Sequence, residues 1–182
     1  MRVFPLALSG VALIEHEVFG DPRGAFFESW NERDFSAAGI EVRFVQENVS
    51  VSARHVLRGL HYQRPHEQGK LVRVLSGEIF DVVVDLRRSS ASFGRSVHVP
   101  LDTRTARSLW VPAGFAHGFL SLADETRVQY KVTDFWAPAA ERTLAWNDPA
   151  LAIPWPLPAQ VEPILSDKDR RGLPLAAAET FL

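Results

Sequence analysis

His61 is the residue with the clearest capacity for acid–base chemistry. It lies in the stretch LRGLHYQ (residues 57–63), whose alternation predicts a β-strand. One face of this strand would carry Gly59, His61 and Gln63, and the other Arg58, Leu60 and Tyr62. A histidine among polar neighbours inside a barrel can act as a general base near neutral pH. The pattern also allows a hydrogen-bonded structural histidine, so both interpretations stay open at this point.

His117 stands in the segment PAGFAHGF, residues 112–119, which resembles the second motif of cupin barrels, where the histidine often binds a metal. The first cupin motif requires an HxH pair, and here Gln63 replaces the second histidine of that pair. A metal ion needs three or four converging ligands. The sequence offers only His61, His117 and Glu67, so we expect no metal.

Tyr130 shares a strand face with Val128 and Val132, which places a phenol on an apolar face where its hydroxyl needs a partner. A core tyrosine bonded to a backbone carbonyl explains this pattern without any catalytic role. Three cations near predicted strand ends, Lys70, Arg58 and Arg23, are equally compatible with a solvated surface.

Asp169 also has two interpretations. The segment Ser166 to Asp169 reads SDKD, an S-x-x-D capping box in which the carboxylate would bond the Ser166 amide. The same carboxylate could serve a site, and spacing alone does not choose between the two.

The elements that must position these residues are mostly short strands separated by turn signals. A helix is expected only at residues 31–38, capped by Asn31 and ended by Gly39. Residues 70–87 are expected to form a hairpin around Ser76-Gly77. Many short strands with little helix predict an all-β sandwich or barrel. The other strands are expected at 11–19, 25–30, 44–52, 56–63, 97–101, 108–112, 117–121 and 127–134.

The tail from Pro154 contains five of the twelve prolines, and only residues 166–171 and 175–180 could form helical turns. It is too rich in large apolar residues for a disordered linker. We therefore expect an extended segment packed over the barrel, and one domain over residues 1–182.

Composition excludes several classes of protein. The net charge of −2 gives no basic surface for nucleic acid or an anionic membrane. Cysteine is absent, which removes disulfides and thiolate chemistry and fits a reducing cytoplasm. Pro5, Ser9 and Gly10 interrupt the apolar N-terminus, and no run reaches the roughly 18 apolar residues of a membrane helix. GxGxxG, GxxxxGK[ST] and GxSxG motifs do not occur. We expect a cytoplasmic protein.

Taken in order, the motifs resemble those of the dTDP-4-dehydrorhamnose 3,5-epimerase family, metal-free cupin enzymes of deoxysugar biosynthesis. The combination of RGLHYQ, GKLVRV and GFAHGF is highly specific, and the resemblance covers about residues 19–170. It implies a cupin-type jelly-roll β-barrel, or double-stranded β-helix, and no cofactor. The matching segments are DPRG with Phe26 and Glu28, VQENVS (45–50), LRGLHYQ (57–63), QGKLV (68–72), FDVVVDLR (80–87), PAGFAHGF (112–119), WNDP (146–149) and LSDKD (165–169).

The resemblance also implies roles for residues. His61 corresponds to the catalytic base, oriented by Asp169, and Tyr130 corresponds to the acid on the opposite face of the sugar. Lys70 corresponds to the cation beside the 4-keto oxygen. Substrate-binding positions are Arg23, Phe26, Glu28, Gln46, Glu47, Asn48, Arg58, Gln63, His117, Glu141 and Lys168. Val49 departs from the family pattern, in which a polar residue or histidine is common.

The family forms homodimers in which an N-terminal strand crosses to the neighbour, so Arg23 and Glu28 would serve the partner's site. The expected reaction is epimerisation at C3 and C5 of a dTDP-4-dehydro-6-deoxy-D-glucose substrate, giving dTDP-4-dehydro-L-rhamnose. Three alternatives stay open: an enzyme that epimerises only C3 or only C5, a non-catalytic cupin that binds sugar nucleotides, and a metal-dependent cupin oxygenase.

Overall fold

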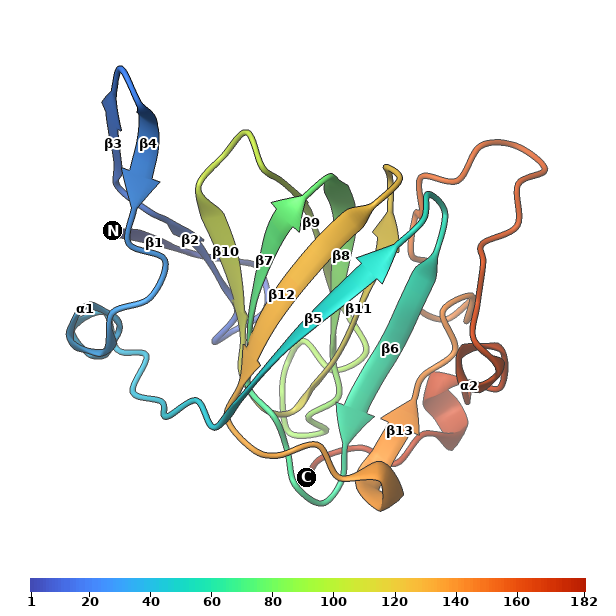
Figure 1. Cartoon of the computed structure of the whole chain (residues 1–182). Coiled ribbons are helices and arrows are strands. Elements are labelled where there is room, and N and C mark those ends of the chain that lie inside the picture. Colours follow the sequence, from blue (N-terminus) through green and yellow to red (C-terminus); the bar gives the residue numbers. More distant parts are fainter.

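Two antiparallel β-sheets face each other in the computed structural model, which describes all 182 residues (Figure 1). Hydrophobic alternation along the strands lets each sheet bury one face against the other. This arrangement confirms the predicted all-β jelly roll. The first sheet has the order β1 (Arg2–Pro5), β2 (Ala12–Glu15), β10 (Arg107–Val111), β7 (Lys70–Ser76), β12 (Thr126–Val132) and β5 (Gln46–Ser52). The second has the order β13 (Glu141–Thr143), β6 (Leu57–Gln63), β11 (Phe115–Ser121), β8 (Glu78–Asp85) and β9 (Ser96–Asp102).

The predicted hairpin over residues 70–87 is wrong in its pairing, although both strands exist. β7 lies between β10 and β12, whereas β8 lies between β11 and β9 in the opposite sheet. The chain crosses between the sheets at Gly77, which has φ +83°. A Cβ there would lie 2.4 Å from Thr126 Oγ1, so the corner requires glycine. Alternation located the strands but carried no information on their partners.

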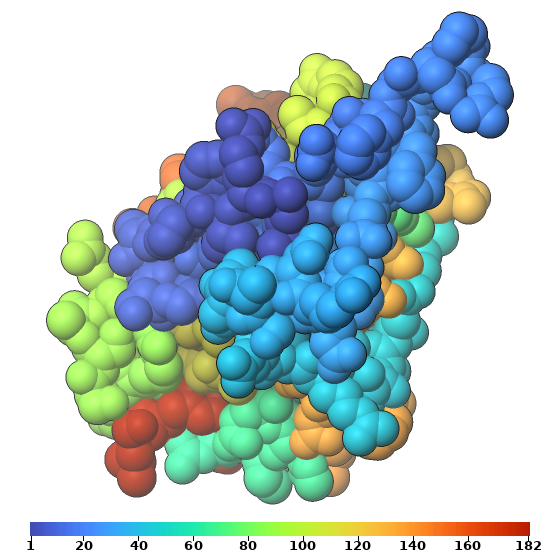
Figure 2. Space-filling model, turned by 90° about the vertical axis from the view of Figure 1, so that its left-hand side faces the viewer, coloured from blue at the N-terminus to red at the C-terminus, as the bar shows by residue number.

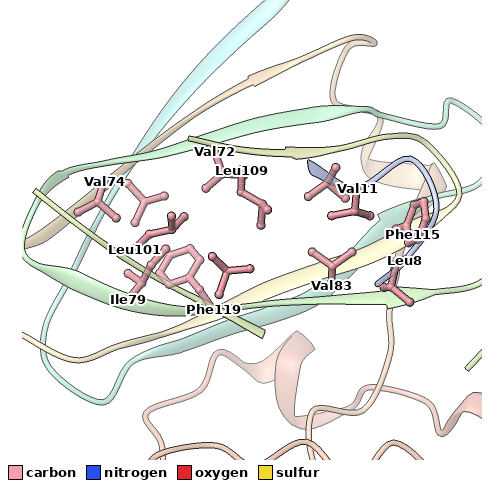
Figure 3. Packing of buried hydrophobic residues seen from close by; sticks show 13 residues of the cluster. Leu8, Val11, Val72, Val74, Ile79, Val83, Leu101, Leu109, Phe115 and Phe119 are labelled. Atoms are coloured by element: carbon pink, nitrogen blue, oxygen red, sulfur yellow. The ribbon is translucent and has the colours of Figure 1, made fainter. Parts of the chain in front are cut away.

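The interior between the sheets is filled by a cluster of 13 buried apolar residues (Figure 3). β7 contributes Val72 and Val74, while β8 contributes Ile79 and Val83 from the facing sheet. These side chains support the strands on which the polar residues of the site also lie.

The outer face of the second sheet is covered by the C-terminal tail, as predicted. Val82, Val84 and Leu86 pack there against tail residues that include Trp155 and Leu175. Single β-bridges from Val56, Arg87 and Leu144 to Ile164, Phe181 and Leu173 fix the tail in place. The tail carries the short helix α2 (Asp167–Arg170) and a 3-10 turn, Leu175–Ala177; another such turn, Pro138–Ala140, precedes β13.

A separate hairpin of β3 (Val18–Asp21) and β4 (Gly24–Phe27) projects from the barrel (Figures 1 and 2). The strand predicted over residues 11–19 is thus divided between β2 and β3, and the one predicted over 25–30 ends at Phe27. Helix α1 (Glu32–Ala37) follows with the predicted cap, since Asn31 accepts a hydrogen bond from the Arg33 amide. Strands β1 and β13 were not predicted, because they are short and lack alternation.

Candidate active site

A cavity of about 360 Å³ lies between the two sheets and is lined mainly by polar side chains. β5, β7 and β12 contribute from the first sheet, while β6 and β11 contribute from the second. The volume falls in the range of small-molecule sites. The predicted site residues along this cavity are Gln46, Asn48, Arg58, His61, Gln63, Lys70, His117, Tyr130, Glu141, Lys168 and Asp169.

His61 and Asp169 form the closest polar contact in the cavity, with Nε2 and Oδ1 2.5 Å apart. They are 108 positions apart, and α2 in the C-terminal tail brings Asp169 against β6. The other ring nitrogen of His61, Nδ1, forms no hydrogen bond with the protein. An imidazole held at one nitrogen by a buried carboxylate, with the other nitrogen free, is the arrangement of an oriented general base.

Ser166 holds the carboxylate of Asp169 in this position. Its hydroxyl donates to Asp169 Oδ2 at 2.8 Å and accepts from the Asp169 amide at 3.2 Å. The two interpretations of the SDKD segment therefore coexist, because Ser166 caps α2 while the carboxylate binds His61. Burial would raise the pKa of Asp169, but the hydrogen bonds from His61 and Ser166 hold it below the usual value. Burial lowers the pKa of His61 despite the opposing effect of Asp169, which favours a neutral base.

A second histidine–aspartate pair lies beside the first and includes a residue that sequence analysis did not assign to the site. His117 is the ladder partner of His61, and its Nε2 lies 2.9 Å from both carboxylate oxygens of Asp81. Asp81 is completely buried, and burial raises its pKa. The available signal for this role was a carboxylate placed between Ile79 and Val83 on the inward face of β8.

Lys70 connects the two pairs. Its Nζ donates to the backbone carbonyl of His61 at 3.2 Å, and the charge of Asp81 favours its ammonium form. Burial lowers the pKa of Lys70 to about 8. The amine is therefore a buried cation near neutral pH, suited to stabilise a developing oxyanion.

Tyr130 faces the cavity from β12, in the sheet opposite to the one that carries His61. Its hydroxyl forms no hydrogen bond with the protein, so it is not the carbonyl-bonded core tyrosine that the pattern allowed. Burial raises its pKa, which keeps the phenol protonated at neutral pH. The cavity therefore has a proton acceptor on one wall and a proton donor on the facing wall.

Arg58 reaches the same cavity as His61, although strict alternation predicted opposite faces. Along β11 the partner of His61 is His117 and the partner of Arg58 is Phe119, so the ladder contains a bulge. Gly59 and Gly118 meet at this point, and a Cβ on Gly59 would lie 2.6 Å from Gly118 Cα. Arg58 is held by Ser52 Oγ at 3.0 Å and by the Val51 carbonyl at 3.0 Å.

At the rim of the cavity, Lys168 Nζ donates to Glu141 Oε1 at 2.6 Å. Gln46 and Gln63 line the cavity, but their amides bond backbone groups of residues 135–137. Gln68 bonds the Asp134 carbonyl of the same loop, which also places Trp136 at the cavity. Neither Gln68 nor Trp136 was predicted as a site residue, although Gln68 begins the matching segment QGKLV.

Four predicted residues lie away from the cavity of their own chain. Glu47 is on the opposite face of β5, where it bonds Lys131 and Gln129, because alternation turns it away from Gln46 and Asn48. Arg23, Phe26 and Glu28 belong to the projecting hairpin or directly follow it. Phe26 is 69% exposed there, and Arg23 pairs with Asp21.

No three His, Cys, Asp or Glu side chains converge into a group that could hold a metal ion. The candidate set of His61, His117 and Glu67 is therefore not brought together, and each histidine uses one nitrogen for a carboxylate. None of the helices has the length and apolar character that crossing a bilayer requires.

Known proteins with similar sequences belong to one enzyme family. The family model described as dTDP-4-dehydrorhamnose 3,5-epimerase matches residues 5–177. A dTDP-4-dehydrorhamnose 3,5-epimerase of Pseudomonas aeruginosa is 55% identical over 182 residues, which is 100% of this chain and 99% of the relative.

Solved structures agree with this match. A dTDP-6-deoxy-D-glucose-3,5-epimerase from Legionella pneumophila, in complex with dTDP-4-keto-L-rhamnose, has a TM-score of 0.93 and 44% identity, covering 98% of this chain and 94% of that one. A 3'-monoepimerase from Streptomyces bikiniensis, in complex with dTDP-quinovose, has a TM-score of 0.88 and 37% identity, covering 94% and 87%. The chain belongs to the dTDP-4-dehydrorhamnose 3,5-epimerase family.

Proposed function

We propose that this protein is an isomerase that epimerises C3 and C5 of dTDP-4-dehydro-6-deoxy-D-glucose, giving dTDP-4-dehydro-L-rhamnose in deoxysugar biosynthesis. The observation that carries the proposal is the position of His61 and Tyr130 on facing walls of one cavity, with Lys70 beside them. Inversion next to a ketone requires a base on one face of the sugar and an acid on the other.

Each inversion proceeds in two steps. His61 takes the proton from the carbon next to the ketone, and the C–H electron pair moves into the ring to form an enolate at O4. The ammonium group of Lys70 stabilises that oxyanion. Tyr130 then donates a proton to the opposite face as the ketone re-forms, and solvent restores the protonation of both residues. Asp169 fixes the orientation of His61 and stabilises the imidazolium that forms.

Arg58, Lys168 and Asn48 supply polar groups along the rest of the cavity. Arginine suits a diphosphate because its guanidinium can donate two parallel hydrogen bonds. We therefore assign the dTDP diphosphate to the Arg58 side of the cavity. The ketone already acidifies the neighbouring C–H bonds, so the scheme is complete without a cofactor.

The test is NMR of dTDP-4-dehydro-6-deoxy-glucose incubated with the protein in deuterated water. Deuterium at both C3 and C5, with the L-rhamno product, is the expected result. Label at one carbon only would support a C3-only or C5-only epimerase, an alternative favoured by the structural likeness to a 3'-monoepimerase. Binding of dTDP without exchange at either carbon would indicate a non-catalytic sugar-nucleotide-binding cupin.

We further propose that one domain of residues 1–182 assembles into a cytoplasmic homodimer, in which the β3–β4 hairpin reaches the partner's cavity. In support, Phe19 and Phe26 on the hairpin are 57% and 69% exposed, and Val49 and Val51 on edge strand β5 are 55% and 48% exposed. A projecting apolar hairpin and an apolar sheet surface are features of an interface.

Complementation between two variants tests the exchange. His61→Asn inactivates a chain's own base, whereas Arg23→Ala affects only the hairpin. If Arg23 serves the partner, a mixed dimer contains one complete site, so subunit exchange between the two variants should give an activity well above that of either variant alone. Sedimentation of a monomer, or no restoration after subunit exchange, would contradict the proposal.

A further inference from the structure

Three glutamine side chains hold the loop that connects β12 to the turn before β13. Gln68 Nε2 donates to the Asp134 carbonyl at 2.8 Å, and Gln63 Nε2 donates to the Phe135 carbonyl at 3.1 Å. Gln46 Oε1 accepts from the Trp136 amide at 3.0 Å, and Gln63 Oε1 accepts from the Ala137 amide at 2.8 Å. Four successive residues are thus each fixed through a backbone group.

The glutamines come from different parts of the barrel, so they fix the loop relative to both sheets. Gln46 begins β5 in the first sheet, Gln63 ends β6 in the second, and Gln68 precedes β7. The loop has no strand partner of its own. A primary amide is needed at Gln63 because it donates and accepts at the same time. We name this arrangement, formed by Gln46, Gln63 and Gln68, the glutamine brace.

The brace places one aromatic side chain at the cavity. Trp136 lines it although the residue is 56% exposed, whereas its neighbour Phe135 is 62% exposed and does not line it. Most other lining groups are polar, so the indole provides one of the few apolar surfaces there. A 6-deoxy sugar has an apolar edge of its own, formed by C5 and the C6 methyl group. An aromatic face and such an edge are complementary.

We infer that Trp136 is a specificity-determining residue that packs on the C5–C6 edge of the hexose, and that the glutamine brace consists of positioning residues for it. The inference rests on the proposed function and deepens it. Double epimerisation requires the singly inverted sugar to stay bound during a second proton exchange. The fixed indole retains the sugar after inversion at C3, because the C5–C6 edge is unchanged until C5 itself inverts.

The test compares product labelling in deuterated water for Trp136→Ala and Phe135→Ala, a matched pair of neighbouring exposed aromatic residues. In Trp136→Ala, the fraction of released sugar with label at a single carbon should rise about fivefold, because the sugar is no longer held in position. For the same reason, kcat/KM should fall about tenfold. Trp136→Phe should restore both values to within about twofold, because the aromatic face is kept. Phe135→Ala should match the unaltered protein.

The brace is tested by Gln63→Met and Gln68→Met, which keep the length of the side chain but remove its hydrogen bonds. Both should increase the singly labelled fraction, Gln63→Met more strongly because it loses two bonds to the loop. The pH dependence of kcat/KM should stay unchanged in both, since neither residue bonds His61, Asp169 or Lys70. Circular dichroism confirms that each variant folds.

An unchanged singly labelled fraction in folded Trp136→Ala would overturn the inference, as would an equal increase in Phe135→Ala. In either case label at both carbons in the unaltered protein would leave the proposed function intact. Label at neither carbon in the unaltered protein would overturn both.

Discussion

The two histidine–aspartate pairs of the cavity have the same composition but different environments. His61 and His117 face each other across the β6–β11 ladder, and each uses Nε2 to contact a carboxylate. The side chain of His61 is 21% exposed, and its partner Asp169 has a lowered pKa. The side chain of His117 is 8% exposed, and its partner Asp81 is fully buried with a raised pKa.

This difference separates their functions. Asp169 remains charged and can stabilise an imidazolium that forms and disappears during each turnover. Asp81 is held by two contacts from one histidine and by the charge of Lys70, so it is a fixed part of the cavity wall. Environments that push the pKa values of similar groups apart mark different catalytic roles. On the proposed mechanism, the pair of His61 is therefore the reacting pair, and the pair of His117 supports it.

The strongest test of the comparison replaces each histidine with asparagine. His61→Asn should lower kcat about 10⁴-fold, because it removes the general base. His117→Asn should lower kcat only about 10- to 100-fold, because it disturbs the positions of neighbouring groups. Steady-state kinetics of the two variants gives the ratio of the two losses in kcat. Equal losses would contradict the division of roles.

Lys70 bonds the backbone of His61 and interacts electrostatically with Asp81, and its substitution separates catalysis from stability. Lys70→Met should lower kcat about 10³-fold through loss of the cation at O4. The pKa of Lys70 is lowered from 10.5 to about 8, so below pH 8 the folded state carries a cation that the unfolded chain accommodates better. Removing this desolvated cation should therefore raise the free energy of unfolding by about 1 kcal/mol. Urea unfolding at pH 7 measures this change, and a large loss of stability would show that Lys70 is mainly structural.

Substitution of Asp169 should mainly lower kcat, whereas substitution of Asp81 should mainly lower the free energy of unfolding. Asp169→Asn should lower kcat about 10²-fold with little change in stability, because it loses the partner that orients the base. Asp81→Asn should instead lower the free energy of unfolding by about 3 kcal/mol, because it breaks a buried pair. Kinetics and urea unfolding of both variants provide the comparison. If Asp81→Asn mainly lowered kcat and Asp169→Asn mainly lowered stability, the reacting pair would be that of His117.

The smallest expected effects are shifts in pH dependence. Activity should rise through a pKa below 6.5, as His61 becomes neutral, and fall near pH 8, as Lys70 loses its proton. Asp169 raises the pKa of His61, so Asp169→Asn should move the rising limb to lower pH. Asp81 raises the pKa of Lys70, so Asp81→Asn should move the falling limb to lower pH. Profiles of kcat/KM measure both, and a shift of the same limb in both variants would contradict the comparison.

Alternation and turn residues were sufficient to locate most strands, the helix after Asn31 and the covering tail. They failed wherever a contact depends on a distant segment. The partners of β7 and β8, the convergence of Asp169 with His61 and the glutamine brace are all set by the order of strands in two sheets, which has no local signal. Arg58 was assigned to the wrong face because a bulge is invisible to a period-two pattern. The roles of His61, Lys70 and Tyr130 came from the family resemblance, since the pattern alone left each with a structural alternative.

The contact between Gly59 and Gly118 has a consequence for anyone who wishes to change this enzyme. A Cβ on Gly118 would lie 2.5 Å from the Arg58 carbonyl, so the backbones of β6 and β11 touch where no side chain can be added. The spacing of His61 and His117 is therefore set by the contact between the backbones of β6 and β11. Mutant libraries that repack the barrel interior should leave this spacing intact, whereas any residue other than glycine at either position should fail early in selection. Altered substrate range is better sought in the loop around Trp136, where side chains hold much of the main chain.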